Sequence, residues 1–115
     1  MSNTLGREKG ATLGPAEVSS LIHREIGNRW DRTNAHGVDL GRCLVLPEKR
    51  TYVLDGGESD EFWLVLEEDP VGHSGYQIVF DEELGLFGLA MANLDGHPDL
   101  VIGLYGTFLQ TLEAM

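Results

Sequence analysis

Apolar positions near the start of the chain recur with a helical period. They are three or four residues apart, which places them on one side of a helix. The positions of this face are Val18, Leu21, Ile22, Ile26 and Trp30. Pro15 stands just before the pattern, at the first position of a helix, where a backbone N–H would have no acceptor within the helix. The pattern predicts an amphipathic helix, with Glu25 and Arg29 paired on its exposed side.

A polar loop is expected at residues 31–41, and after it the apolar positions alternate, which is typical of strands. Pro47 opens a turn-like segment at 47–50, so the pattern predicts a hairpin there. Tight turns are also expected at 81–85, with Gly85 at positive φ, and at the Asp-Gly pair of 93–96. The predicted strands cover residues 42–46, 51–54, 62–67, 76–81, 86–92 and 100–104.

The last apolar cluster again has helical spacing. Thr107 and Gln110, three residues apart, form a capping-box pattern at its start. The inward positions of this short helix are Phe108, Leu109, Leu112 and Met115. Parallel crossovers need a dozen or more residues, and the connections here are shorter. We therefore predict an α+β fold: an antiparallel meander sheet of about five to six strands, with both helices packed on one face.

Residues 1–13 are polar and lack periodicity, so we expect a flexible N-terminal segment followed by a single domain at 14–115. A sheet covered by helices on one side leaves its other face open. Trp63, Val65 or Tyr105 is expected on that face. Such a face would suit a partner or a second copy of the chain.

Charge is distributed unevenly along the sequence. The chain has 115 residues with 8 Lys and Arg against 19 Asp and Glu, a formal net charge of −11. Every Lys and Arg lies in the first 50 residues, whereas 13 of the acids lie after residue 50. Phosphate groups are bound by Lys and Arg, so this balance argues against direct binding to nucleic acid.

The sequence also disfavours a membrane protein, a secreted protein and a protein with a disulfide or a site of several thiolates. No apolar run approaches the roughly 18 to 20 residues of a membrane helix, and the first residues lack the apolar core of a secretory signal. We expect a cytoplasmic protein, of bacterial origin. Cys43 is the only cysteine, so neither an intrachain disulfide nor a site with several thiolates is available.

Catalytic motifs are absent from the sequence, and we assign no catalytic residue, cofactor or metal ligand. There is no G-x-S-x-G motif, and Cys43 lies in an apolar run typical of a core position. No H-E-x-x-H pattern relates the four histidines, which are His23, His36, His73 and His97. The acidic segments 55–61 and 93–99 have a composition suited to Ca²⁺ but do not match the EF-hand pattern, so we interpret them as turns. The glycine-bearing corner at 103–107 is interpreted as a structural connection.

We interpret the chain as a non-enzymatic acidic protein that docks a basic protein, as an inhibitor or immunity-type protein would. Two alternatives remain: a small-ligand or metal-assisted enzyme with a carboxylate-lined pocket near Trp30, Trp63 and Tyr76, and a structural domain that homodimerises through the open sheet face. The predicted docking residues are acids at strand ends. They are Asp55, Glu58, Asp60, Glu61, Glu67, Glu68, Asp69, Asp81, Glu82 and Glu83.

Overall fold

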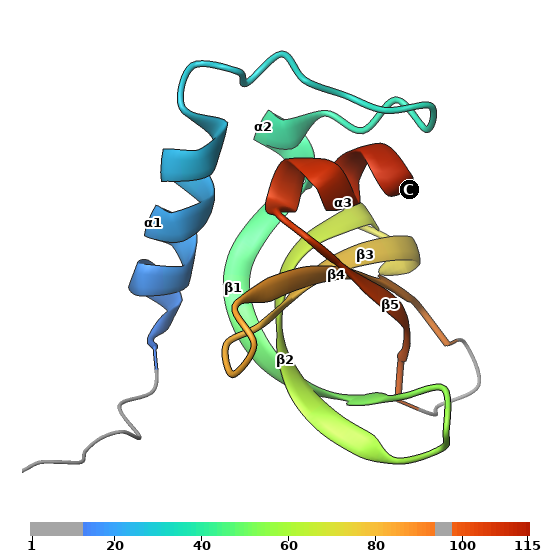
Figure 1. Ribbon diagram of the computed structural model, residues 1–115. Coiled ribbons are helices and arrows are strands. Elements are labelled where there is room, and N and C mark those ends of the chain that lie inside the picture. The colour runs from blue at the N-terminus through green and yellow to red at the C-terminus, as the bar shows by residue number, and fades with distance from the viewer. Residues whose placement is uncertain (1–12, 94–97) are drawn as a thin grey trace, which may run out of the picture.

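The computed structural model describes residues 13–93 and 98–115 (Figure 1). The predicted flexible segment and the turn at 93–96 therefore lie largely outside the described residues. Within these residues, three helices and five strands follow one another. Their order is α1 (Pro15–Ile26), α2 (Leu40–Cys43), β1 (Leu44–Val53), β2 (Ser59–Asp69), β3 (Ser74–Asp81), β4 (Leu86–Met91), β5 (Leu100–Gly106) and α3 (Phe108–Ala114).

The strands form one closed barrel in the order β1-β2-β3-β4-β5. Each strand is antiparallel to the next, which confirms the predicted α+β class with an antiparallel meander. A parallel contact closes the barrel, with Val53 of β1 opposite Leu100 of β5. Here the Val53 N–H donates to the Asp99 carbonyl at 2.9 Å. Register shifts in three of the strand pairs bend the sheet, and such bulges are how short strands turn the corners of a barrel.

Closure creates two apolar layers. The inner layer takes one side chain from each strand: Tyr52, Phe62, Val79, Ala90 and Val101. The outer layer lies between the barrel wall and the helices, where α1 runs beside β1 and α3 lies across one end of the barrel (Figure 1). Burial of apolar surface in both layers is the main stabilising contribution.

Helix α1 begins at Pro15, as predicted, and the carboxylate of Glu17 accepts the Gly14 N–H at 2.7 Å. Its buried face consists of Val18, Ile22 and Ile26. The predicted continuation to Trp30 is wrong. The helix ends before Gly27, which has φ +58°, and the Trp30 side chain is 41% exposed. A glycine ends the helix here because it reaches positive φ without steric cost. None of the described helices is long and apolar enough to cross a membrane.

Glu25 joins α1 to α3 instead of pairing with Arg29. Its two carboxylate oxygens accept the backbone N–H groups of Phe108 and Leu109 at 3.1 and 2.8 Å. These are unpaired donors of the first turn of α3, where a negative charge also suits the helix dipole. Arg29 donates to the Glu25 carbonyl at 2.8 Å. The predicted capping box of Thr107 and Gln110 is present.

The predicted hairpin at 47–50 is wrong, because β1 runs through Pro47 as one strand. Leu44 pairs with Leu66 and Glu48 with Leu64, so β1 has two more residues than β2 between these pairs. Pro47 lies in this irregularity, where the missing N–H is tolerated. The start of the predicted strand 42–46 is also wrong, since residues 42 and 43 belong to the single turn of α2. The side chain of Asp39 caps that turn by accepting the Gly41 N–H at 2.9 Å.

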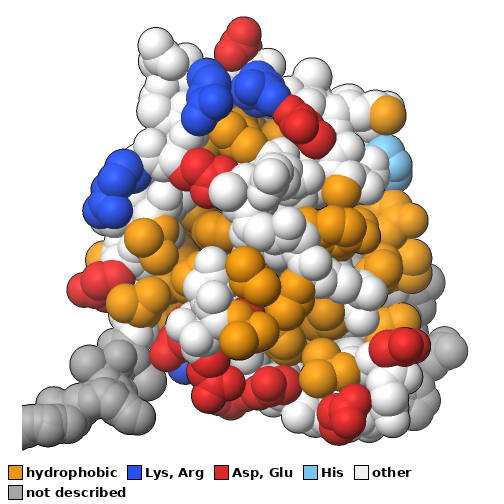
Figure 2. Space-filling view, in the orientation of Figure 1, with side chains coloured by type: hydrophobic (Ala, Val, Ile, Leu, Met, Phe, Trp, Pro, Cys, Tyr) orange, Lys and Arg blue, Asp and Glu red, His pale blue; other side chains and the backbone are white. Residues whose placement is uncertain are grey.

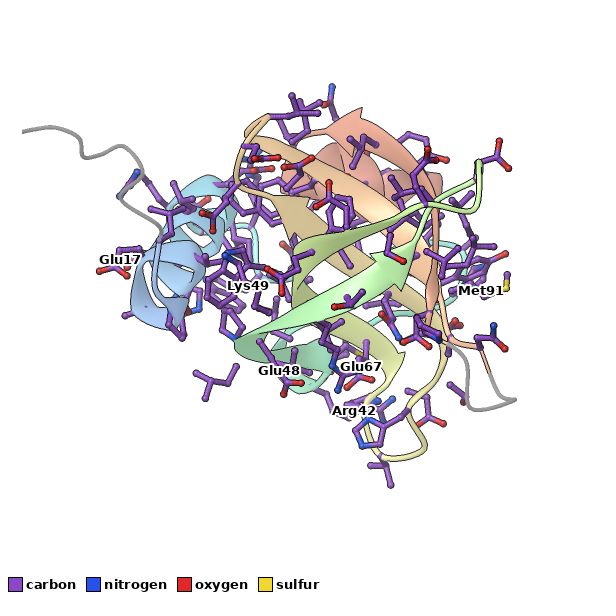
Figure 3. All side chains as sticks on the ribbon, turned by 90° about the horizontal axis from the view of Figure 1, so that it is seen from below. Glu17, Arg42, Glu48, Lys49, Glu67 and Met91 are labelled. Atoms are coloured by element: carbon purple, nitrogen blue, oxygen red, sulfur yellow. The ribbon has the colours of Figure 1, made fainter. Side chains whose placement is uncertain are left out.

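The expected open face of the sheet is largely covered. Trp63 and Val65 are 5% and 0% exposed, so placing them on an open face is wrong, whereas Tyr105 is 46% exposed. One uncovered part of the outer wall lies on β4 and β5. There Met91 and Leu100 face each other in register, and Ile102 lies two residues further along β5. These three side chains are 40 to 44% exposed, and Met91 points away from the barrel (Figure 3).

Candidate protein-binding surface

The ten predicted docking residues separate into two groups at opposite ends of β2. We call one group the acidic end; it comprises Asp55, Glu58, Asp60, Glu61, Asp81, Glu82 and Glu83. The other, the histidine end, comprises Glu67, Glu68 and Asp69 together with His36 and His73. At about 3.3 Å per residue, Glu61 and Glu67 are roughly 20 Å apart along the strand. The structure therefore brings Asp60 and Glu61 together with the acids of 81–83, places Asp55 and Glu58 further out in the β1–β2 turn, and separates Glu67, Glu68 and Asp69 from all of them.

The acidic end forms where the start of β2 meets the turn after β3. Trp63 pairs with Phe80, so the residues before Trp63 lie beside those after Phe80. A depression of ≈ 180 Å³ opens between them. It is lined by Lys49, Asp60, Glu61, Asp81, Glu82 and Glu83. In Figure 2, Asp and Glu side chains follow the lower edge of the face, and Figure 1 places the β1–β2 turn at the lower right of the same view.

Glu82 is the acidic-end carboxylate that contacts a Lys side chain. Its Oε1 accepts the indole N–H of Trp63 at 2.7 Å and lies 3.3 Å from the Lys49 ammonium. The ammonium also lies 5.3 Å from the centre of the Trp63 ring, within the range of a cation–π contact. Lys49 comes from β1, so this contact ties β1 to the turn after β3 (Figure 3).

The other carboxylates of the acidic end have no Lys or Arg partner within the described residues. Asp81 is buried and closes its own turn, accepting the N–H groups of Glu83 and Leu84 at 2.9 and 3.3 Å. Asp60 accepts the N–H of Glu61 at 2.8 Å. The exposed members are Asp55, Glu58, Asp60, Glu61 and Glu83. Their charge faces solvent without neutralisation.

At the histidine end the local structure satisfies each carboxylate. The Tyr76 N–H at 3.0 Å, followed by His36 at 2.8 Å, lowers the pKa of Glu68 below its ordinary value. The N–H of Gly72 at 2.9 Å, followed by the Ser74 hydroxyl at 3.0 Å, lowers the pKa of Asp69 in the same way. Hydrogen bonds to an ionised carboxylate favour that form.

Glu67, also at the histidine end, is 3% exposed and lies 3.0 Å from Nδ1 of His73. The position of Glu67 follows from the register, because it pairs with Gln77, whose side chain is also buried. Its carboxylate is not presented to a partner, unlike those of the acidic end.

A buried polar network inside the barrel has no counterpart in the sequence analysis. The Tyr52 hydroxyl donates to Gln77 at 2.8 Å, and the Gln77 amide donates to the Asp99 carboxylate at 2.7 Å. Asp99 also accepts the Asn93 N–H at 2.9 Å. Tyr52 and Gln77 are 0% and 2% exposed, and burial raises the pKa of Tyr52 well above its usual range. Alternation at 76–81 predicts one buried face, whereas both faces are buried and Gln77 lies on the inner one.

Metal-binding geometry is not found in the described residues. No group of three or more His, Cys, Asp or Glu side chains there is arranged to hold a metal ion. The segment 93–99 lies partly outside those residues. Cys43 is buried, with its sulfur 3.7 Å from the Glu68 carbonyl. At the corner 103–107, the first N–H groups of α3 are taken by Glu25 and Thr107 rather than left for an anion.

Comparison of the chain with models of known protein families, with curated proteins and with solved structures found no match. The function is therefore argued from the residues and their geometry alone.

Proposed function

We propose that this protein binds a basic protein through its acidic end, without catalysing a reaction. The observation that carries the proposal is the group of exposed carboxylates at one pole of the barrel that lack a Lys or Arg partner among the described residues. Those residues are Asp55, Glu58, Asp60, Glu61 and Glu83. Lysine and arginine side chains of a partner would supply the missing counter-charges. An inhibitor or immunity-type role and a cytoplasmic location are part of this proposal.

Electrostatic reasoning supports a binding role over a purely structural one. Like charges gathered on one surface disfavour the compact state, so the repulsion among the exposed acids is unfavourable in the isolated chain. In a complex the same field accelerates encounter with a cationic protein and weakens as salt screens it. Binding should therefore be fast at low ionic strength and strongly dependent on salt.

The test compares two triple variants that raise the net charge equally. The first, Asp55→Asn with Glu61→Gln and Glu83→Gln, neutralises the acidic end. The control, Asp31→Asn with Glu48→Gln and Glu113→Gln, neutralises exposed acids elsewhere. Each tagged protein is used to capture partners from its native lysate, and the dissociation constant for a purified partner is then measured at several salt concentrations.

A stoichiometric basic partner that binds the natural chain and the control, but binds the acidic-end variant at least tenfold more weakly, supports the proposal. The partner must also dissociate at high salt. Equal binding to all three proteins, or equal loss from both variants, contradicts it. Sedimentation velocity of the same samples reports whether the chain self-associates.

The two alternatives have less support from the geometry. Small-molecule sites usually have volumes of about 300 to 1,000 Å³ and are mostly apolar, whereas the depression at the acidic end is ≈ 180 Å³ and lined by charged residues. A larger hollow of ≈ 330 Å³ is lined by Trp30 and other residues of the α1–α2 connection, and neither Trp63 nor Tyr76 lines it. Homodimerisation through an open sheet face would be limited to the exposed apolar side chains of β4 and β5, because Trp63 and Val65 are buried.

A further inference from the structure

Four large hydrophobic side chains are exposed on two neighbouring strands, β4 and β5. They are Met91 on β4 and Leu100, Ile102 and Tyr105 on β5, each between 40 and 46% exposed. Figure 2 shows hydrophobic side chains over the region where Figure 1 places these two strands. We call the four side chains the uncharged face. Exposed apolar side chains that gather in this way are typical of a surface that another protein covers.

Neither strand contributes a charge to this face. Residues 86–91 and 100–106 contain no Asp, Glu, Lys or Arg, whereas β1, β2 and β3 all contain charged residues. Asp99 directly precedes β5, but its carboxylate accepts the Gln77 amide at 2.7 Å and the Asn93 N–H at 2.9 Å. That acid is therefore engaged within the fold, and apolar contact is the interaction that the uncharged face offers.

The net charge of the chain favours a second copy as the occupant of the uncharged face. With a formal net charge of −11, copies of the chain repel one another wherever their acids meet. At the uncharged face two copies can meet without a charged side chain of β4 or β5 between them. A basic protein would find no counter-charge there, so charge complementarity directs such a partner to the acidic end instead.

We propose that two copies of the chain associate through their uncharged faces. In a two-fold arrangement the same four side chains lie on both sides of the contact, so each copy supplies the apolar surface that covers the other. Four partly exposed side chains bury less than the roughly 800 Å² per partner of a standard interface. The dimer should therefore be weak, with a dissociation constant on the order of tens of micromolar. It does not depend on partner binding at the acidic end.

The effect of salt distinguishes this contact from binding at the acidic end. The two copies have the same net charge, so screening favours their association, whereas screening weakens the binding of a basic protein. Sedimentation velocity over a range of protein concentrations, at about 50 and 500 mM salt, measures the dissociation constant of the dimer. We expect this constant to be about two- to fivefold smaller at the higher salt concentration.

Two substitutions that introduce the same charge test where the copies meet. Ile102→Asp places a carboxylate on the uncharged face. Leu46→Asp is the matched control, because Leu46 is an exposed apolar residue of β1, a strand that pairs with β5 only through Val53. Ile102→Thr keeps a β-branched residue in the strand and decides the test should the aspartate variant fail to fold. Circular dichroism verifies the fold of each variant.

The natural chain and Leu46→Asp should form the same dimer. Ile102→Asp should raise its dissociation constant about tenfold or more, and Ile102→Thr about three- to tenfold, through the loss of apolar contact. A natural chain that stays monomeric at about 500 μM overturns the proposal, including the case in which a different protein occupies the face. A dimer that survives both Ile102 substitutions, that Leu46→Asp weakens equally, or that dissociates as salt is added also overturns it. None of these outcomes decides the acidic-end test, whose variants lie outside β4 and β5.

Discussion

The two ends of β2 carry runs of acids that look alike in the sequence but have opposite surroundings in the structure. At the histidine end, backbone N–H groups and two histidines engage Glu67, Glu68 and Asp69. At the acidic end, Glu61 and Glu83 face solvent, and Lys49 reaches only Glu82 among the described carboxylates. The carboxylates of the histidine end have partners within the fold, whereas the exposed ones of the acidic end have no Lys or Arg partner among the described residues.

The difference arises from what each turn supplies. The β2–β3 turn contains Gly72 and Ser74, which donate to Asp69, and its histidine reaches back to β2. The β3–β4 turn uses Asp81 to close itself and offers no further donors to Glu83. Because no Lys or Arg follows Arg50 in the chain, neutralisation at the acidic end depends on the single Lys49 contact from β1.

The largest effect on stability is expected inside the barrel, beside the histidine end. Gln77→Leu leaves the buried Tyr52 hydroxyl without its acceptor and removes the Gln77 amide from Oδ2 of Asp99. Each unsatisfied group costs about 1–3 kcal/mol, so we expect the free energy of unfolding to fall by roughly 2–4 kcal/mol. Urea unfolding followed by circular dichroism measures it. Glu61→Gln is the control at the acidic end, and a loss as small as that of this control would contradict the role of the network.

Alkaline pH should weaken the same network. Burial raises the pKa of Tyr52 in the folded chain, whereas in the unfolded chain it is about 10. The stabilisation is therefore complete below pH 10 and is lost as the pH rises above it, since the unfolded state then ionises first. Urea unfolding between pH 8 and 11 should show this decline. In Tyr52→Phe the decline should be shallower, and an unchanged slope would exclude Tyr52 as its source.

Acid pH should lower the stability that the histidine end contributes, because the pKa shifts there are downward, opposite to that of Tyr52. The pKa values of Glu68 and Asp69 are lowered in the folded chain, so their contribution is present above the unfolded values near 4 to 4.5. It is lost as the pH falls through the folded values. Glu68→Gln should therefore reduce the loss of stability between pH 5 and 3, as seen in urea midpoints. Glu83→Gln, at the acidic end, should leave that loss as steep as in the natural chain.

The smallest effect is expected from neutralising the acidic end itself. Glu61→Gln with Glu83→Gln removes like charges and no partner, so stability should rise by about 0.2–0.5 kcal/mol at low salt. Added salt should abolish the gain, because screening already relieves the repulsion in the natural chain. Thermal unfolding at two ionic strengths measures both values. A clear loss of stability would mean that these carboxylates have structural partners.

Periodicity and capping patterns predicted the parts of the fold that depend on local sequence. The starts of α1 and α3, the positive φ of Gly85 and the antiparallel order of the strands all follow from neighbouring residues. The predictions were wrong where contacts between residues far apart in the sequence determine the local structure. Pro47 fits inside a strand because β2 accommodates an irregularity, and Glu25 caps α3 because the two helices meet.

The candidate surface was also predictable in part, because the turns that carry its acids depend on local sequence. Turn signals place Asp60, Glu61 and the acids of 81–83 at strand ends, and antiparallel pairing then brings those ends together. Burial of Glu67 and Gln77 on the inner side of the barrel was not predictable, because it depends on closure and on a register shift after Leu64. A single sequence contains no local sign of either.

The barrel is closed by the pairing of Val53 in β1 with Leu100 in β5, and this affects the order in which the chain folds. The hairpins from β1 to β5 join neighbouring segments, whereas the Val53 contact with Leu100 joins residues far apart in the sequence. Contacts of long sequence separation are slow to form, because a long loop must be ordered before they give any stabilisation. We expect the four hairpins to assemble first and the seam between β1 and β5 to close last. The Val53 amide should then be the last of the strand amides to gain protection during refolding.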